Sequence, residues 1–98
     1  MIEIYNFQDL IEVINQEVMV IIVRSNNCSV CKTISARLEL MMHNFPLYNI
    51  YIEKVREFSG QFLVFTTPAI LIFSQRKEIL REARFINFKK IEKLLQLY

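Results

Sequence analysis

Short apolar segments with strand-like or helix-like spacing fill most of the chain and predict alternating strands and helices. Residues 18–23 form an uninterrupted apolar run rich in β-branched side chains, which is typical of a central strand buried on both faces. Further strands are predicted at residues 2–5, 47–53, 69–73 and 78–85. Apolar residues recur at helical spacing in residues 7–14, 28–45, 55–62 and 88–98. The predicted order is β-α-β-α-β-α-β-β-α.

Polar and special residues set the boundaries of these segments. Asn6 and Asn87 can each cap the helix that follows, because an asparagine side chain accepts hydrogen bonds from free helical N–H groups. Pro46 marks the end of the second helix, and Gly60 weakens the second half of the third. The polar residues 74–77 predict a turn that joins the last two strands into a hairpin.

The order of elements predicts the layers of the fold. Each amphipathic helix must bury its apolar stripe against the sheet, so helices should cover both sides of it. The expected class is α/β, a three-layer α/β/α sandwich around a mixed sheet. With 98 residues, 53% of them hydrophobic, the chain is expected to form a single domain over residues 1–98.

Charge and hydropathy exclude some classes of partner. The net formal charge is +2, and the 12 basic and 10 acidic residues are scattered, so no basic face for nucleic acid is expected. The run at 18–23 is far shorter than the roughly 20 residues of a membrane-spanning helix, so no membrane partner is expected. Residues 1–5 do not resemble the start of a secretory signal, which predicts a cytoplasmic protein.

The candidate chemistry lies in the segment Cys28-Ser29-Val30-Cys31. Residues three apart on a helix lie about 5–6 Å apart, a separation that a disulfide tolerates. Cys28 begins the helix, where free N–H groups and the helix dipole favour a thiolate, so we predict that Cys28 is the nucleophile. Cys31 lies one turn deeper and can attack a mixed disulfide formed at Cys28, as the resolving thiol.

Other roles for the cysteines remain open at this point. The same spacing supplies half of many zinc sites, but the chain has only these two cysteines and one histidine, His43. We therefore expect no metal and no cofactor, and we expect His43 to be a surface residue near a helix C-terminus. The cysteines could also be small buried hydrophobic residues with no chemical role.

A strand, a CxxC at a helix start, a Thr-Pro ahead of a hairpin and a final helix resemble the thioredoxin family along nearly the whole chain. Segments 27–32 and 59–68 are similar to short bacterial thioredoxin-like proteins. This resemblance implies a thiol-disulfide oxidoreductase that acts on disulfide-containing protein substrates. A thiol reductase or a low-molecular-weight thiol would be its electron donor.

The resemblance also implies a substrate-binding segment at Thr67 and Pro68. Pro68 would be the cis-proline of the family, lying across from Cys28, and the backbone of Thr67 would pair with an extended substrate segment. A proline here also removes an N–H donor and turns the chain before a strand, so a purely structural role is an alternative. The two roles are compatible.

Several positions depart from the thioredoxin pattern. Asn27 stands where thioredoxins have tryptophan, and Ile22 stands where they have a buried aspartate that handles the proton of the resolving thiol. Arg84 replaces a glycine near the last strand, where a cation could select acidic partners or could simply be solvated. Arg24 could support the Cys28 thiolate or could be an exposed arginine without a special role.

These departures favour considering two alternative functions. One is a thioredoxin-like binding or redox-sensing module with little turnover, in which the cysteine pair changes a partner surface. The other is a dimer that holds an iron-sulfur cluster between two Cys28 thiolates, although a neighbouring cis-proline would crowd it. Glutathione dependence of the glutaredoxin type is disfavoured, because no Gly-Gly element follows Ala69.

Overall fold

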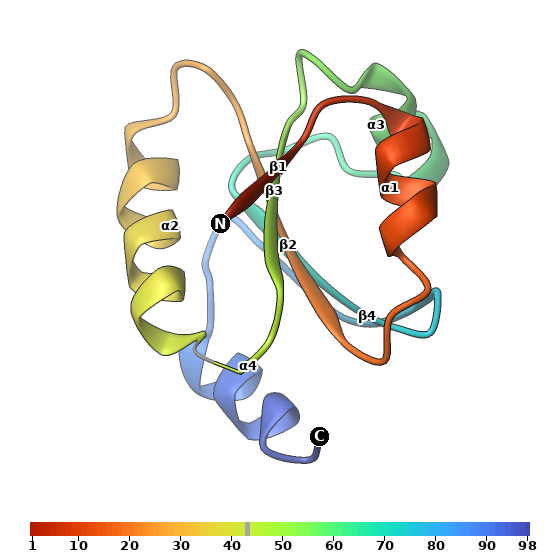
Figure 1. Ribbon diagram of the computed structural model, residues 1–98. Helices are drawn as coiled ribbons and strands as arrows, with labels where there is room; N and C mark the ends of the chain where they lie inside the picture. The colour runs from red at the N-terminus through yellow and green to blue at the C-terminus, as the bar shows by residue number, and fades with distance from the viewer. Residues whose placement is uncertain (43) are drawn as a thin grey trace.

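Five strands form one mixed sheet in the computed structural model, which describes residues 1–42 and 44–98 (Figure 1). The strands are β1 (Ile2–Ile4), β2 (Met19–Arg24), β3 (Leu47–Tyr51), β4 (Ala69–Ser74) and β5 (Lys77–Ala83). They lie in the order β1-β3-β2-β4-β5, with β1, β3 and β2 parallel and the β4–β5 hairpin antiparallel. The expectation for His43 lies outside the described residues.

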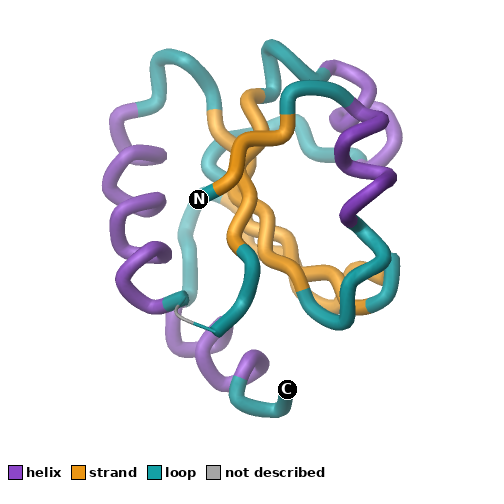
Figure 2. Tube along the Cα trace, viewed as in Figure 1, coloured by secondary structure: helices purple, strands orange, loops and turns teal. Residues whose placement is uncertain are grey.

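Helices cover both faces of this sheet, as Figures 1 and 2 show. On one face lie α1 (Phe7–Val13) and α3 (Arg56–Phe62), and on the other lie α2 (Ser29–Met41) and α4 (Phe88–Leu95). The predicted order of elements and the predicted three-layer α/β/α sandwich are confirmed. Among the helices that the structure describes, none is long and apolar enough to cross a membrane.

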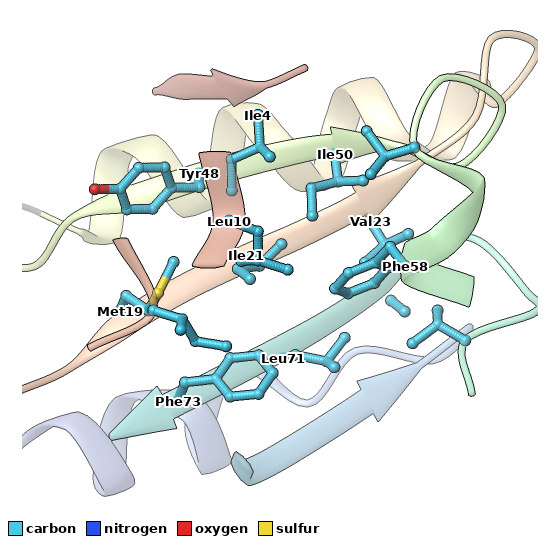
Figure 3. Packing of buried hydrophobic residues seen from close by; sticks show 14 residues of the cluster. Ile4, Leu10, Met19, Ile21, Val23, Tyr48, Ile50, Phe58, Leu71 and Phe73 are labelled. Carbon is cyan, nitrogen blue, oxygen red and sulfur yellow. The ribbon is translucent and has the colours of Figure 1, made fainter. Parts of the chain in front are cut away.

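The strand β2 explains why the sheet has two cores. Its residues Met19 to Val23 have no exposed surface, and their side chains alternate between the two faces. On the α1/α3 face, Ile21 belongs to a buried cluster that includes Phe58 and Phe73 (Figure 3). The Phe62 ring packs against this cluster, 4.9 Å from Phe58 and 5.4 Å from Phe73. On the opposite face, Ile22 packs with Leu38 of α2.

The predicted caps are in place at the two helices that carry them. The Asn6 side chain accepts a hydrogen bond from the Asp9 backbone N–H at 2.9 Å, and Asn87 accepts one from Lys90 at 3.1 Å. The α3 helix forms despite Gly60, because Gly60 lies on its exposed side while Phe58 is fully buried. Tertiary packing therefore outweighs the weak helix propensity of glycine at this position.

Some boundaries predicted from the sequence were wrong. The α2 helix ends at Met41 rather than close to Pro46, β3 ends at Tyr51 rather than at residue 53, and β5 ends at Ala83 rather than at residue 85. In the predicted apolar stripe of α2, Val30 was also wrong, because it is 54% exposed. The rest of the stripe packs in the core as predicted: Ile34, Leu38, Met41, Met42 and Phe45.

Candidate active site

Cys28 and Cys31 lie where β2 ends and α2 begins. Cys28 is the N-cap residue of α2 with an extended backbone, and its Sγ accepts a hydrogen bond from the Cys31 backbone N–H at 3.1 Å. The two cysteines form a disulfide, and their Cα atoms lie 5.2 Å apart. The structure thus brings the two predicted redox residues together at a helix N-terminus.

The two sulfur-bearing residues differ in exposure. Cys28 is half-buried, whereas Cys31 has no exposed surface. A partner molecule can therefore approach Cys28 but not Cys31. In the reduced protein, the free N–H groups of the first turn of α2 favour the thiolate of Cys28. This geometry suits an outer attacking sulfur and an inner resolving sulfur.

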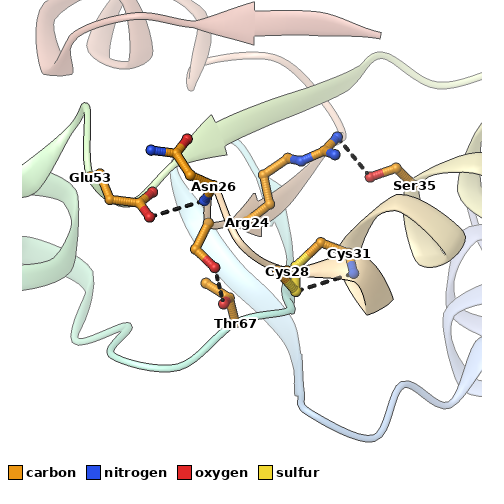
Figure 4. The surroundings of a disulfide bond; sticks show 8 residues. Arg24, Asn26, Cys28, Cys31, Ser35, Glu53 and Thr67 are labelled. Atoms are coloured by element: carbon orange, nitrogen blue, oxygen red, sulfur yellow. Dashed lines mark hydrogen bonds between the residues drawn. A yellow bond between two sulfur atoms is a disulfide. The ribbon is translucent and has the colours of Figure 1, made fainter.

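A hydrogen bond connects the loop before Cys28 to the segment before Pro68. The hydroxyl groups of Ser25 and Thr67 lie 2.9 Å apart in a hydrogen bond, and the Asn26 backbone N–H donates to the Glu53 carboxylate at 2.9 Å (Figure 4). These contacts hold the cysteine loop against two segments that are distant in the sequence. Thr67 is consequently placed beside the disulfide loop, although it lies about forty residues after it.

The Thr67–Pro68 peptide bond is cis, and Pro68 is buried. Its carbonyl oxygen accepts a hydrogen bond from the Arg84 backbone N–H at 2.9 Å, just before the β4–β5 pairing starts. Within residues 1–42 and 44–98, the Thr67 backbone makes no hydrogen bond to another backbone group. Its N–H and C=O groups are therefore not used by the hydrogen bonding of the sheet itself.

Arg84 forms part of the rim of this site. Its backbone is left-handed, with φ of 64°, in a conformation that favours glycine, and its side chain is exposed. The next residue, Phe85, is 90% exposed. The backbone of Arg84 thus lies beside Pro68 on the β5 side, and an exposed aromatic ring follows it in the chain.

Arg24 is neither a freely solvated arginine nor a direct partner of Cys28. It is half-buried at the end of β2, and its Nη1 donates to the Ser35 hydroxyl oxygen at 3.1 Å. The guanidinium carbon lies 5.1 Å from the centre of the Tyr51 ring. The Arg24 side chain thus extends under α2 to Ser35, one helical turn after Cys31 (Figure 4).

The sequence analysis missed two buried polar residues near the site. Ser35 is 4% exposed and Asn49 is 7% exposed, and Asn49 lies beside Ile22 in the parallel β2–β3 pair. A signal for each was present, because Ser35 follows Cys31 by one helical turn and Asn49 interrupts an apolar strand. Ile22 itself is fully buried, so the buried carboxylate of thioredoxins has no counterpart there. Among the described residues, no three His, Cys, Asp or Glu side chains gather into a metal site.

Comparison with known proteins gives one clear sequence relative. The chain is 39% identical over 72 residues to the thioredoxin-like protein YdfQ of Bacillus subtilis strain 168. The match covers 70% of this chain and 64% of the relative, so the chain spans somewhat less than two thirds of that protein. No protein-family model matches the chain.

Solved structures of thioredoxins share the fold. A Plasmodium falciparum thioredoxin superposes with a TM-score of 0.86 at 13% identity, covering 100% of this chain and 99% of that one. The Fasciola hepatica thioredoxin gives 0.85 at 18% identity, covering 98% of both chains. At such low identity the likeness establishes the thioredoxin fold, and the chemistry has to be argued from the site.

Proposed function

Because this chain is thioredoxin-like in both sequence and fold, we propose that it is a thiol-disulfide oxidoreductase that acts on protein disulfides through Cys28 and Cys31. One observation carries this proposal. A half-buried Cys28 caps a helix and is joined to a fully buried Cys31 one turn further in. Residues 1–98 would act as one domain, without a bound cofactor.

The reaction consists of two exchange steps. The Cys28 thiolate attacks a substrate disulfide, so that a Cys28–substrate disulfide forms and the first substrate thiolate leaves. The Cys31 thiolate then attacks the Cys28 sulfur, so that the Cys28–Cys31 disulfide forms and the second substrate thiolate leaves. Two electrons pass from the cysteine pair to the substrate, and the two protons of the pair end on the substrate thiols.

Thr67 and Pro68 form the proposed binding segment for the substrate. The backbone N–H and C=O of Thr67, which bond to no other backbone group among the described residues, would pair with an extended stretch of the substrate next to its disulfide. The bond between the hydroxyl groups of Ser25 and Thr67 supports this role, because it couples the position of that segment to the loop carrying Cys28.

A thiol reductase or a low-molecular-weight thiol would return the pair to the dithiol. The cytoplasm is the compartment that we propose for such a cycle, because its reductants keep exposed disulfides of this kind turning over. In that setting the protein works as a reductant of its substrates.

The test measures reduction of a protein disulfide with dithiothreitol as electron donor. Cys28→Ser should abolish turnover, because it removes the attacking sulfur, whereas Cys31→Ser should accumulate a stable mixed disulfide at Cys28. Ser29→Ala is the matched control, since Ser29 is an exposed neighbour on the same helical turn. Turnover by Cys28→Ser at the rate of the unmodified protein would contradict the proposal.

The absence of a carboxylate at Ile22 supports a second candidate, a binding or redox-sensing module with little turnover. In that case partners would bind equally well to the Cys28→Ser, Cys31→Ser double variant, and multiple turnovers would not occur. Partners recovered only as mixed disulfides with Cys31→Ser would instead support the oxidoreductase.

A further inference from the structure

A small polar cluster lies under the N-terminal half of α2, in a face of the sheet that is otherwise apolar. It consists of Arg24, Ser35, Asn49 and Tyr51. Ser35 and Asn49 are the two buried polar residues among the described residues of the chain. Arg24 reaches Ser35 at 3.1 Å and Tyr51 at 5.1 Å, so it connects the strands to the helix.

The strand register places this cluster on the side of the cysteines. Arg24 lies opposite Tyr51 and Ile22 lies opposite Asn49 in the parallel β2–β3 pair. Side chains two residues apart on a strand share a face, and Ile22 packs against α2. The polar side chains of both strands therefore point toward α2, at the carboxyl end of the strands, where the helix begins.

Ser35 connects the arginine to Cys31. The two residues are four apart on α2 and both are buried, so they occupy consecutive turns of the same helix face, where side chains lie about 5–6 Å apart. The guanidinium group donates directly to Ser35. It consequently lies beside Ser35, on the helical turn that follows the fully buried Cys31.

In the disulfide state this cation has no anionic partner among residues 1–42 and 44–98. Its Nε is buried and has no hydrogen-bond partner in the part of the chain that the structure describes. The Tyr51 ring offsets part of the cost of burying the charge. Burying an incompletely paired cation is unfavourable, and an anion that forms nearby lowers that cost.

We propose that Arg24, anchored by Ser35, is a positioning residue that stabilises the thiolate of Cys31 in the reduced protein and in the mixed disulfide. The inference rests on the proposed oxidoreductase function. It assigns the activation of the inner thiol to a fixed positive charge instead of a buried carboxylate base. The proton of Cys31 is then lost to water before the attack, and the electron pair of the thiolate forms the new bond to the Cys28 sulfur.

Other charges around this end of the sheet are placed differently. The Nζ of Lys54 lies 4.8 Å from the same Tyr51 ring and is salt-bridged to Glu3, while Glu53 is engaged by the Asn26 N–H. Lys32 of α2 and Arg84 of the β5–α4 loop are exposed. Among these groups, Arg24 is the cation held beneath α2 by a hydrogen bond that it donates to Ser35 of that helix.

The experiment measures the pKa of the Cys31 thiol in a Cys28→Ser background, by the pH dependence of the ultraviolet absorbance of the thiolate, which needs no reagent to reach the buried sulfur. Arg24→Gln should raise this pKa by about one unit and slow resolution of a mixed disulfide about tenfold at neutral pH. Formation of the mixed disulfide by Cys28, measured in a Cys31→Ser background, should change by less than about threefold. Arg24→Lys should retain most of the effect, because it keeps the charge.

The reduction equilibrium gives a second measurement. Stabilising a thiolate favours the reduced state, so Arg24→Gln should make the pair about tenfold harder to reduce at a pH where Cys31 is ionised, equivalent to about 30 mV. The difference from the unmodified protein should shrink as the pH falls and the thiol becomes protonated. Arg37→Gln is the matched control, because Arg37 is an exposed α2 arginine that lies over Phe88.

An unchanged Cys31 pKa in folded Arg24→Gln would overturn the inference. An equal rise of the Cys31 pKa in the control Arg37→Gln would also overturn it. If Arg24→Gln does not fold, the Ser35→Ala variant serves as the test. It keeps the charge of Arg24 but removes the hydrogen bond that holds the guanidinium group in place. A smaller rise of the Cys31 pKa in Ser35→Ala supports the inference, and no rise overturns it. Failure of the oxidoreductase function itself would appear separately, as a Cys28 that forms no mixed disulfide.

Discussion

The two faces of the sheet are built differently. On the α1/α3 face the buried residues form one continuous apolar cluster that includes Phe58 and Phe73. On the α2/α4 face an apolar cluster fills the part near α4, whereas polar residues occupy the part beneath the start of α2. The sheet thus has one face that only stabilises the fold and one face that also carries the proposed chemistry.

This difference shows how a domain of this size can hold a half-buried cation. Among the described residues, the polar end has one buried nitrogen without a hydrogen-bond partner, Arg24 Nε, which lowers stability locally. The α1/α3 face compensates with aromatic rings in close contact. The comparison predicts that equivalent substitutions on the two faces have different consequences.

The largest effect is expected from placing a carboxylate on each face of β2. Ile21 and Ile22 are adjacent and fully buried, but Ile21 pairs with Tyr48 and faces the apolar cluster, whereas Ile22 lies beside Asn49. Ile21→Asp should not fold, because an unpaired buried charge costs several kcal/mol or more. Ile22→Asp should remain folded with reduced stability, because Arg24 lies two residues further along the same face.

Circular dichroism and urea unfolding of the two variants check this prediction. Ile21→Asn and Ile22→Asn are the controls, since they add a polar side chain of similar size without a charge. Equal losses for the two aspartate variants would contradict the difference between the faces.

A second comparison removes one large side chain from each core. Phe58→Ala should cost about 3–5 kcal/mol and Leu38→Ala about 2–5 kcal/mol, through lost contacts and the cavity left behind. Both residues have no exposed surface.

Only Leu38→Ala should change the reduction equilibrium of the cysteine pair, because Leu38 holds α2 against the sheet. Urea unfolding of the oxidised protein gives the stabilities, and equilibration with glutathione gives the potentials. A shift of potential in Phe58→Ala alone would argue that the α1/α3 face also tunes the site.

Much of the apolar architecture was predictable from the sequence. The run in β2 and the Asn6 and Asn87 caps are local signals, and each is confirmed. The polar cluster was not predictable as a unit, because its members come from β2, α2 and β3 and meet only through strand register. The phase of α2 was predicted correctly from Ile34 onward, but Val30 fitted the stripe by hydrophobicity and is exposed, while the structure buries Cys31 in the first turn. At the start of this helix, hydrophobicity alone therefore did not indicate which side chain is buried.

The caps of the two faces should contribute equally. Asn6→Ala at α1 and Asn87→Ala at α4 should each lower stability by about 1 kcal/mol, because each leaves one N–H of the first turn without its acceptor. Neither cap touches the disulfide, so the reduction equilibrium should not move. Thermal unfolding measures the losses, and Gln8→Ala, an exposed substitution within α1, serves as the control. A much greater loss at Asn87 would indicate that α4 depends on its cap more than on the packing of Ile91 and Leu95.

The smallest effects are expected at two arginines with left-handed backbones on opposite sides of the molecule. Arg76 has φ of 73° in the β4–β5 turn, where its N–H donates to Ile14 just after α1, and Arg84 has φ of 64° at the rim of the site. Arg76→Gly and Arg84→Gly should each stabilise the protein by less than about 1 kcal/mol, because relief of the unfavourable φ exceeds the entropy cost of glycine. Only Arg84→Gly should change the rate with protein disulfides, since it opens the approach to Thr67 and Pro68, while reduction of a small aromatic disulfide should be unchanged in both. A changed rate with the small disulfide in Arg84→Gly would mean that Arg84 acts on the cysteines themselves. Its charge would then influence the reactivity of the site instead of limiting the access of protein substrates.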